Sequence, residues 1–210
     1  KEILDLLELI HEDISGIKIG LQYITQRSPE EIRELSRFKK PIFYDGKFFD
    51  IKNTLVESIK SLKDLNVSYA TVHLLNGLDA LVAANKAAQK INLNLLGVSV
   101  LTSFSDNDLK DLGFNNTVKD QVERLIKIAV DANLYGVICS ALETKMIKEI
   151  APNLKCFTPG IRSGDIKDDQ KRTMNANEAI KAGSDCLIIG RPITEGDPKK
   201  NIKNILSTIE

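Results

Sequence analysis

The sequence predicts an α/β protein built as a TIM (β/α)₈ barrel, with the first strand missing from this sequence. Short apolar runs alternate with amphipathic helical patterns, which indicates parallel βαβ units. No GxGxxG motif follows an early strand, which disfavours a doubly wound dinucleotide-binding sheet. Polar residues gather where the predicted strands end, as they do in barrels with one functional face. No linker or low-complexity tract divides the chain, so residues 1–210 are expected to form a single barrel domain.

Each predicted strand is a short apolar run bounded by polar or turn-forming residues. These runs are Gly16–Ile19, Pro41–Asp45, Tyr69–His73, Leu95–Val100, Gly136–Cys139, Lys155–Thr158 and Cys186–Ile189. The predicted helices show apolar residues at helical spacing, with capping residues or proline at the start and glycine after the end. They are Lys1–His11, a helix starting at Pro29, one opened by a Thr54–Glu57 capping box, then Leu78–Ile91, Thr117–Ala132, Ala141–Ile150, Asn177–Ala182 before Gly183, and a final helix from Pro198.

The composition excludes several classes of protein. Hydrophobic residues make up 42% and charged residues 28%, unlike disordered or fibrous chains. The 29 Lys+Arg balance the 29 Asp+Glu without a basic stripe, so no nucleic-acid partner is expected. No apolar run reaches the roughly 18 residues of a membrane span, and the N-terminus lacks a signal-peptide pattern, so we expect a cytoplasmic protein. The cysteines lack CxxC spacing and are predicted to be small buried hydrophobes: Cys139, Cys156 and Cys186.

The segment YDGKFFDI at 44–51 holds the strongest candidate for catalysis. Asp45 and Lys47 are two apart on a predicted strand, so both side chains are expected on one face, near the open end of the barrel. Asp50 falls in the following loop. Two carboxylates around one ammonium would keep the lysine charged and available as a general acid. A structural ion pair at a strand end is the equally weighted alternative.

Two further segments suggest an anion site. TPGIR at 158–162 predicts a strand end and a tight turn before a polar loop, although an exposed surface loop would look the same. Gly190 and Arg191 follow the last predicted strand, where barrels often bind phosphate. Lys18 is a charge inside an apolar run, and either extends to solvent or reaches into the site. His73 is interpreted as structural, and the two histidines of the chain show no zinc-binding spacing.

Together these motifs resemble the orotidine 5′-phosphate decarboxylase family, in its bacterial-like type 1 form. The family signature Asp-x-Lys-x-x-Asp-Ile-x-x-Thr matches this sequence over 45–54. KIG, LTS, PGIR, DQKR and GRPI occur in the family order and with similar spacing over the whole chain. The matching residues are Lys18, Asp45, Lys47, Asp50, Ile51, Thr54, Thr102, Arg162, Gln170, Gly190 and Arg191.

The resemblance implies decarboxylation of orotidine 5′-monophosphate to UMP and CO₂ without metal or organic cofactor. It implies that Lys47 protonates C6, while Asp45 faces the departing carboxylate and holds Lys47. It also implies a homodimer with shared active sites, in which Asp50 reaches the partner's site. The implied substrate-binding residues are Lys18, which binds the ribose and extends the Asp–Lys network, Asp50 with Thr54 at the ribose, Ile51, Thr102 at the pyrimidine, and Arg162, Gln170, Gly190 and Arg191 at the phosphate.

The sequence departs from the family pattern at several positions. Gly46, Phe49 and Lys52 stand where the family commonly has Leu, His and Pro, and HLLNG at 73–77 replaces a run of small residues. Two alternatives therefore stay open. One is a Mg²⁺-dependent sugar-phosphate lyase with the same Asp-x-Lys-x-x-Asp core, which EDTA would inhibit. The other is a phosphate-binding barrel without catalysis, which would bind a UMP analogue without turnover.

The length of 210 residues is short for a (β/α)₈ barrel, which typically needs about 250 residues. Seven strands are predicted, and the first, just before Lys18, corresponds to the family's second. The family's first strand ends in an Asp that binds the ribose, and no equivalent precedes Lys1. We therefore expect that a longer chain is needed for full activity.

Overall fold

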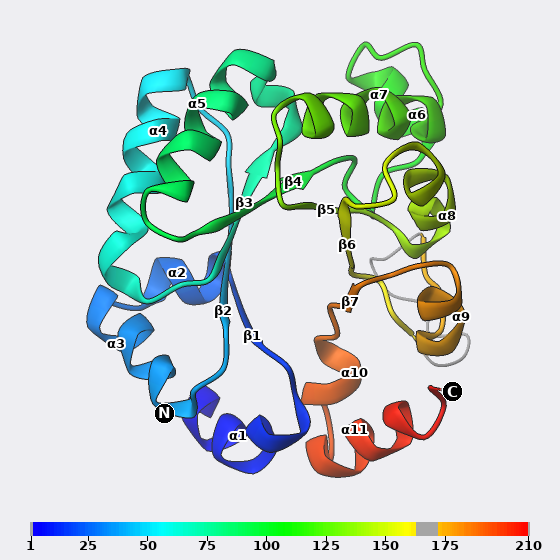
Figure 1. Cartoon of the computed structure of the whole chain (residues 1–210). Coiled ribbons are helices and arrows are strands. Elements are labelled where there is room, and N and C mark those ends of the chain that lie inside the picture. Colours follow the sequence, from blue (N-terminus) through cyan, green and yellow to red (C-terminus); the bar gives the residue numbers. More distant parts are fainter. Residues whose placement is uncertain (1, 163–171, 210) are drawn as a thin grey trace.

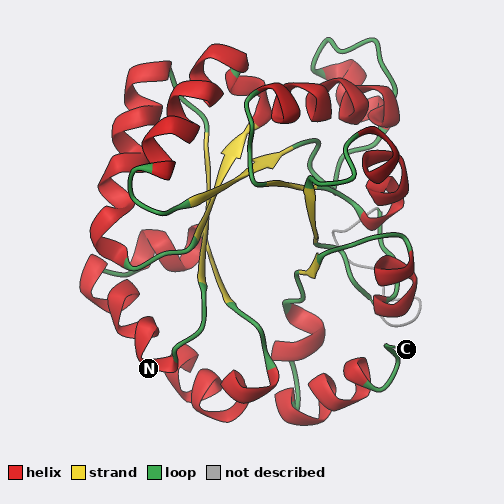
Figure 2. Ribbon diagram, viewed as in Figure 1, coloured by secondary structure: helices red, strands yellow, loops and turns green. Residues whose placement is uncertain are grey.

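The computed structural model describes residues 2–162 and 172–209. These residues form a seven-stranded parallel sheet in the order β1-β2-β3-β4-β5-β6-β7. The strands curl around a central axis and the helices form an outer ring, as Figures 1 and 2 show. This arrangement confirms the predicted (β/α) barrel architecture, and β1 and β7 are the two edge strands of the described sheet.

The strands lie where the apolar runs predict them, with small shifts at their ends. β3 and β6 match the predicted ranges, β2 continues to Phe48, and β4, β5 and β7 end earlier than expected. Each strand pairs in parallel with the next along the chain. The strands are β1 (Ile17–Gly20), β2 (Ile42–Phe48), β3 (Tyr69–His73), β4 (Asn94–Val98), β5 (Gly136–Ile138), β6 (Lys155–Thr158) and β7 (Cys186–Leu187).

The predicted helices are all present, and short ones join them in the loops. The α-helices are α1 (Glu2–Ile10), α2 (Leu21–Gln26), α3 (Pro29–Glu34), α4 (Lys52–Lys60), α5 (Leu78–Gln89), α6 (Asp106–Asp111), α7 (Val118–Asp131), α8 (Ala141–Ile150), α9 (Ala176–Lys181), α10 (Arg191–Thr194) and α11 (Pro198–Leu206). The 3₁₀ helices are η1 (His11–Asp13), η2 (Leu35–Phe38), η3 (Ser61–Leu65) and η4 (Leu74–Asn76). The sequence patterns did not predict α2, α6 and α10, which are too short to show a clear helical period.

One predicted capping box is wrong. α4 begins at Lys52, with Ile51 in the N-cap position and no side-chain cap, so Thr54 lies inside the first turn. The Thr-x-x-Glu pattern alone does not determine where a helix begins, because the residues before it can already adopt helical backbone angles. A capping box forms instead at Ser28 and Glu31, just before and within the helix that Pro29 opens. Gly183 follows α9 with a φ of 104°, as its C-terminal position predicts.

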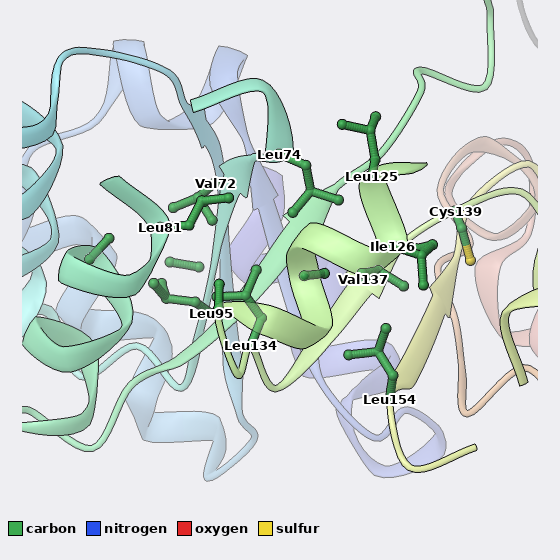
Figure 3. Close-up of a cluster of buried hydrophobic side chains, with 14 of the residues drawn as sticks. Val72, Leu74, Leu81, Leu95, Leu125, Ile126, Leu134, Val137, Cys139 and Leu154 are labelled. Carbon is green, nitrogen blue, oxygen red and sulfur yellow. The ribbon is translucent and has the colours of Figure 1, made fainter. Parts of the chain in front are cut away.

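The main hydrophobic core lies between the sheet and helices α4, α5, α7 and α8 (Figure 3). Leu81 and Ile126 on the helices and Val72, Leu95 and Val137 on the strands are fully buried in it. A separate apolar cluster fills the inside of the barrel between β2, β4, β5 and β6. The predicted burial of cysteines holds for Cys139 and Cys156, whereas Cys186 is only partly buried. No helix in the described parts of the chain is long and apolar enough to span a membrane.

Candidate active site

The carboxylate of Asp45 is the centre of a charged cluster inside the carboxyl-terminal end of the sheet. Its Oδ2 atom lies 2.8 Å from Nζ of Lys47 and 3.2 Å from Nζ of Lys18. Its Oδ1 atom accepts a hydrogen bond of 3.1 Å from the hydroxyl of Thr71. These groups come from three adjacent strands, β1, β2 and β3. The Asp45 side chain is only 12% exposed, whereas the two lysines are each 34% exposed.

The backbone of β2 is irregular where it carries this cluster. Tyr44 pairs with Ala70 but Phe48 pairs with Val72, so β2 has two extra residues relative to β3. Lys47 has a φ of 47°, in the left-handed region that non-glycine residues seldom adopt. Bulges of this kind redirect side chains beside functional sites. Asp45 and Lys47 therefore meet as the sequence predicts, but through a bulge rather than through the simple alternation of a regular strand.

Thr71, which the sequence motifs did not indicate as a site residue, holds this irregular backbone in place. Its hydroxyl accepts a 2.8 Å hydrogen bond from the backbone N–H of Lys47 while donating to Asp45. The side chain is fully buried on β3. A hydroxyl in the apolar strand YATVH, next to the acidic strand, was the signal that could have identified it.

The departure at Gly46 also has a structural reason. A Cβ atom at this position would lie 2.8 Å from Cε1 of Tyr44, and the rings of Tyr44 and Phe48 stack with centroids 5.8 Å apart. Glycine therefore leaves room for the aromatic pair that packs beside the bulge.

The electrostatic environment keeps Asp45 ionised. Burial raises the pKa of Asp45, but the nearby ammonium groups of Lys18 and Lys47, with their hydrogen bonds, lower it by more. The net pKa lies below the ordinary value of an aspartate. The cluster therefore holds an ionised carboxylate between the amino groups of two lysines. In a surface ion pair the carboxylate would be exposed to solvent. The burial of the Asp45 side chain therefore favours a functional site over a structural ion pair at the surface.

The expected array of two carboxylates around Lys47 is wrong within one chain. No Lys47–Asp50 ion pair is present among the described residues, and Asp50 is exposed. Its Oδ1 atom instead accepts a 2.7 Å hydrogen bond from the N–H of Ile51. The second charged partner of Asp45 is Lys18, whose side chain reaches the carboxylate instead of extending only into solvent. Sequence spacing could not show this, because Lys18 lies 27 residues away and only the β1–β2 pairing brings it close.

The loop after β2 is held by Asn76, another residue that the sequence analysis did not single out. Asn76 Oδ1 accepts the N–H of Asp50 at 3.1 Å, and its Nδ2 atom donates to the carbonyl groups of Phe48 and His73. The unusual HLLNG segment thus fastens the Asp50 loop to the end of β3. Lys52 lies in the same region and pairs with Asp79 at 2.9 Å.

His73 has a structural role, as interpreted from the sequence. Its Nδ1 atom accepts a 3.3 Å hydrogen bond from the N–H of Leu75, and its ring lies 5.5 Å from that of Phe49. Burial and the charge of Lys47 lower the pKa of His73. The ring is therefore neutral near pH 7, as the hydrogen bond to Nδ1 requires.

The remaining predicted residues lie after several strands of the sheet. Thr102 follows β4, and Arg162 follows β6, with its side chain buried and its Nη1 atom 2.9 Å from the carbonyl of Ile161. Gly190 and Arg191 follow β7 and begin α10, and a Cβ atom at Gly190 would meet open space. Ile51 and Thr54 are exposed at the start of α4, and Gln170 lies outside the described residues.

No group of three or more His, Cys, Asp or Glu side chains suited to a metal ion occurs within residues 2–162 and 172–209.

Comparisons with known proteins agree on one family. Residues 1–205 match the orotidine 5′-phosphate decarboxylase / HUMPS family. Orotidine 5′-phosphate decarboxylase of Wolbachia pipientis subsp. Culex pipiens (strain wPip) is 38% identical over 202 residues, covering 95% of this chain and 89% of the relative. That of Ehrlichia canis (strain Jake) is 38% identical over 208 residues, covering 98% and 91%. The crystal structure of orotidine 5′-phosphate decarboxylase from Lactobacillus acidophilus has a TM-score of 0.81 at 29% identity, covering 97% of this chain and 92% of that chain.

We predict that Thr71→Val lowers the free energy of unfolding by about 1.5–3 kcal/mol, because it removes the hydroxyl that bonds Oδ1 of Asp45 and the N–H of Lys47. Urea denaturation measures this change. Thr144→Val is the matched control, since this equally buried hydroxyl contacts the carbonyl of Ser140 on its own helix at 3.4 Å. We expect the control to cost about 1 kcal/mol or less. Equal losses in the two variants would contradict the role of Thr71.

We also predict that the stability gap between the wild type and Asp45→Asn narrows as pH falls. Because the pKa of Asp45 is lowered by folding, the unfolded state binds the proton more readily. The contribution of ionised Asp45 is complete above the unfolded pKa of about 4 and is lost as pH falls through the lower folded pKa. Urea denaturation from pH 7 to pH 3 measures the gap, and a gap that does not depend on pH would refute this assignment.

Proposed function

The chain belongs to the orotidine 5′-phosphate decarboxylase / HUMPS family, and we propose that Lys47 is the residue that protonates C6 as orotidine 5′-monophosphate loses CO₂. The protein is a carboxy-lyase, and its product, UMP, places it in pyrimidine biosynthesis. The observation that supports the role of Lys47 is the buried Asp45 carboxylate, which fixes the lysine ammonium at 2.8 Å.

The proposed chemistry follows from where charge develops. When the bond between C6 and the carboxylate breaks, the electron pair stays on C6 and CO₂ departs. No electron sink conjugates with that pair, so a fixed ammonium beside the carbon stabilises the developing charge. Lys47 then donates a proton from Nζ to form the C6–H bond of UMP and regains a proton from solvent. Asp45 faces the departing carboxylate; Lys18 and Lys47 keep it ionised, and the hydrogen bond from Thr71 helps to fix it.

The other predicted residues are proposed to bind the remainder of the substrate. Lys18, Ile51 and Thr54 would lie around the ribose, and Thr102 would contact the pyrimidine. The phosphate would be held by Arg162, Gln170, Gly190 and Arg191. Binding energy from this distant phosphate can be used at the reacting carbon, so a substrate without phosphate is expected to lose rate as well as affinity.

The reaction is proposed to need no metal ion or organic cofactor. The positive charge that a metal could supply at C6 comes instead from the ammonium of Lys47, which Asp45 fixes in place while Lys18 also contacts the carboxylate. We further propose that residues 1–210 form one barrel domain and that the enzyme acts in the cytoplasm.

The protein is also proposed to act as a homodimer with shared active sites. Four large apolar side chains are exposed on the two segments that Asn76 ties together. Exposed apolar patches of this kind mark interfaces, and a second copy placed there would bring Asp50 near a partner's site. The four residues are Phe49 (62% exposed), Ile51 (74%), Leu75 (41%) and Leu78 (44%).

We predict that Lys47→Ala lowers kcat by about 10⁴-fold or more while the protein stays folded, because both the proton donor and the fixed positive charge are lost. Loss of orotidine 5′-monophosphate absorbance in buffer containing EDTA measures turnover. Lys60→Ala is the control, since Lys60 is an exposed α4 lysine paired with Glu57. Appreciable turnover by Lys47→Ala would overturn the role of Lys47, and EDTA-sensitive turnover of the wild type would contradict metal independence.

Mixing the inactive Lys47→Ala and Asp50→Ala variants is expected to restore activity. In a mixed dimer one site combines an intact Lys47 with an intact Asp50 from the other subunit. Random mixing makes about half of the dimers hybrid, each with one working site, so about a quarter of wild-type activity should return. Activity no greater than the sum of the separate variants would refute shared sites.

A further inference from the structure

Arg172 lies at the point where three segments near the active site meet, and nothing in the catalytic scheme uses it. We propose that Arg172 is a positioning residue that holds the segment carrying Thr102 against the start of α8 and against the strand end that carries Arg162. The proposal rests on the function above, because it assigns Arg172 an effect on the same site.

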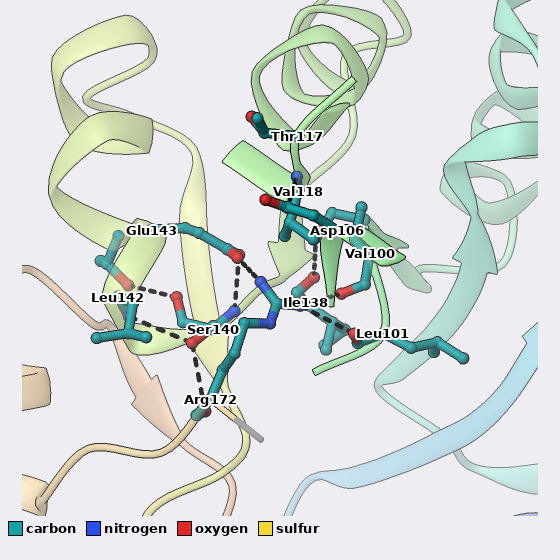
Figure 4. Close-up of polar contacts among 12 residues, drawn as sticks. Val100, Leu101, Asp106, Thr117, Val118, Ile138, Ser140, Leu142, Glu143 and Arg172 are labelled. Carbon is teal, nitrogen blue, oxygen red and sulfur yellow. Dashed lines mark hydrogen bonds and ion pairs between the residues drawn. The ribbon is translucent and has the colours of Figure 1, made fainter. Parts of the chain in front are cut away.

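The guanidinium of Arg172 donates hydrogen bonds to the backbone just before Thr102 (Figure 4). Its Nη2 atom donates to the carbonyl of Val100 at 3.1 Å and to that of Leu101 at 2.9 Å. These carbonyls follow β4, where the chain leaves the sheet toward α6. The two hydrogen bonds to consecutive carbonyls therefore fix the direction in which the Thr102 segment leaves the strand.

The same guanidinium is anchored on its other side by Glu143 of α8. Nη1 of Arg172 forms an ion pair with Oε1 of Glu143, and the side chains are 13% and 7% exposed. Glu143 is itself fixed, because its Oε2 atom accepts the N–H of Ser140 at 3.0 Å in a capping box. The hydroxyl of Ser140 lies 3.4 Å from the carbonyl of Arg172 and donates to it. Arg172 is therefore held through both its side chain and its backbone (Figure 4).

The backbone next to Arg172 leads directly to the predicted phosphate residues. Met174, two residues on, accepts the N–H of Arg162 at 3.0 Å and donates its own N–H to the carbonyl of Gly160 at 3.2 Å. A chain of short contacts thus joins the Arg162 turn, Arg172 and the Thr102 segment. The two ends of the substrate would be bound by segments that are fixed relative to each other.

Stability alone is a poor explanation for this arrangement. A buried ion pair contributes little net stability, because the cost of removing two charges from water offsets their attraction. A residue of similar size without charge could fill the space. A planar guanidinium, by contrast, can hold one carboxylate and two carbonyl groups at once, which fixes geometry.

The test compares Arg172→Met with Lys148→Met. Lys148 also joins an ion pair, with Asp185 at 2.6 Å, to a backbone carbonyl, that of Leu154 at 2.8 Å, but near the start rather than the end of the neighbouring strands. We expect Arg172→Met to lower kcat/KM for orotidine 5′-monophosphate by about 10²-fold, as small misplacements of binding groups do. Lys148→Met should lower the melting temperature but leave kcat/KM within about twofold of the wild type.

Arg172→Lys should give an intermediate kcat/KM, because an ammonium cannot hold Glu143 and both carbonyls together. If Arg172→Met loses stability but keeps the kcat/KM of Lys148→Met, the proposal is overturned.

Amide hydrogen exchange of residues 101–105 gives an independent readout that needs no turnover. Faster exchange there in Arg172→Met than in Lys148→Met supports the proposal, and equal exchange in the two overturns it. Absence of wild-type turnover would refute the proposed function instead, while the exchange comparison would still decide whether Arg172 restrains this segment.

Discussion

The contact between the Asp45 carboxylate and two ammonium groups is the constraint on which the rest of the site depends. A buried carboxylate is costly unless charged or hydrogen-bonding partners surround it. Lys18, Lys47 and Thr71 provide those partners, and each comes from a different strand. The β1–β2 and β2–β3 registers must therefore be correct together, because a slip by one residue would turn a partner to the other face of the sheet.

The irregular backbone of β2 is a local cost that the surrounding fold offsets. A left-handed Lys47 is disfavoured by roughly 1–2 kcal/mol. The hydroxyl of Thr71 bonds the Lys47 N–H, and Gly46 leaves space for the Tyr44–Phe48 stack beside the bulge. The fully buried core behind the sheet keeps these strands in place, so the strain is concentrated where the proposed chemistry needs an ammonium next to a carboxylate.

Fixed geometry also connects this cluster with the residues proposed to bind the rest of the substrate. Because the strands are parallel, their carboxyl ends lie at one end of the sheet, and Thr102, Arg162 and Gly190 all follow such strand ends. Strand order alone does not fix the loops, however. Asn76 ties the Asp50 loop to β3, and Arg172 ties the Thr102 segment to α8. Both residues act through backbone carbonyl and N–H groups, which suits the positioning of loops rather than contact with substrate.

The sequence by itself determined the alternation of strands and helices, the strand order and the residues of the Asp45–Lys47 pair, because apolar periodicity and motif spacing are local properties. Local patterns were insufficient at two points. The Thr54–Glu57 capping box did not form, and the contact of Lys18 with Asp45 depends on the pairing of β1 with β2 rather than on sequence spacing. Only the tertiary structure could decide these points, as well as the bulge at Lys47, since strand register and burial set which groups meet and which charges need a partner.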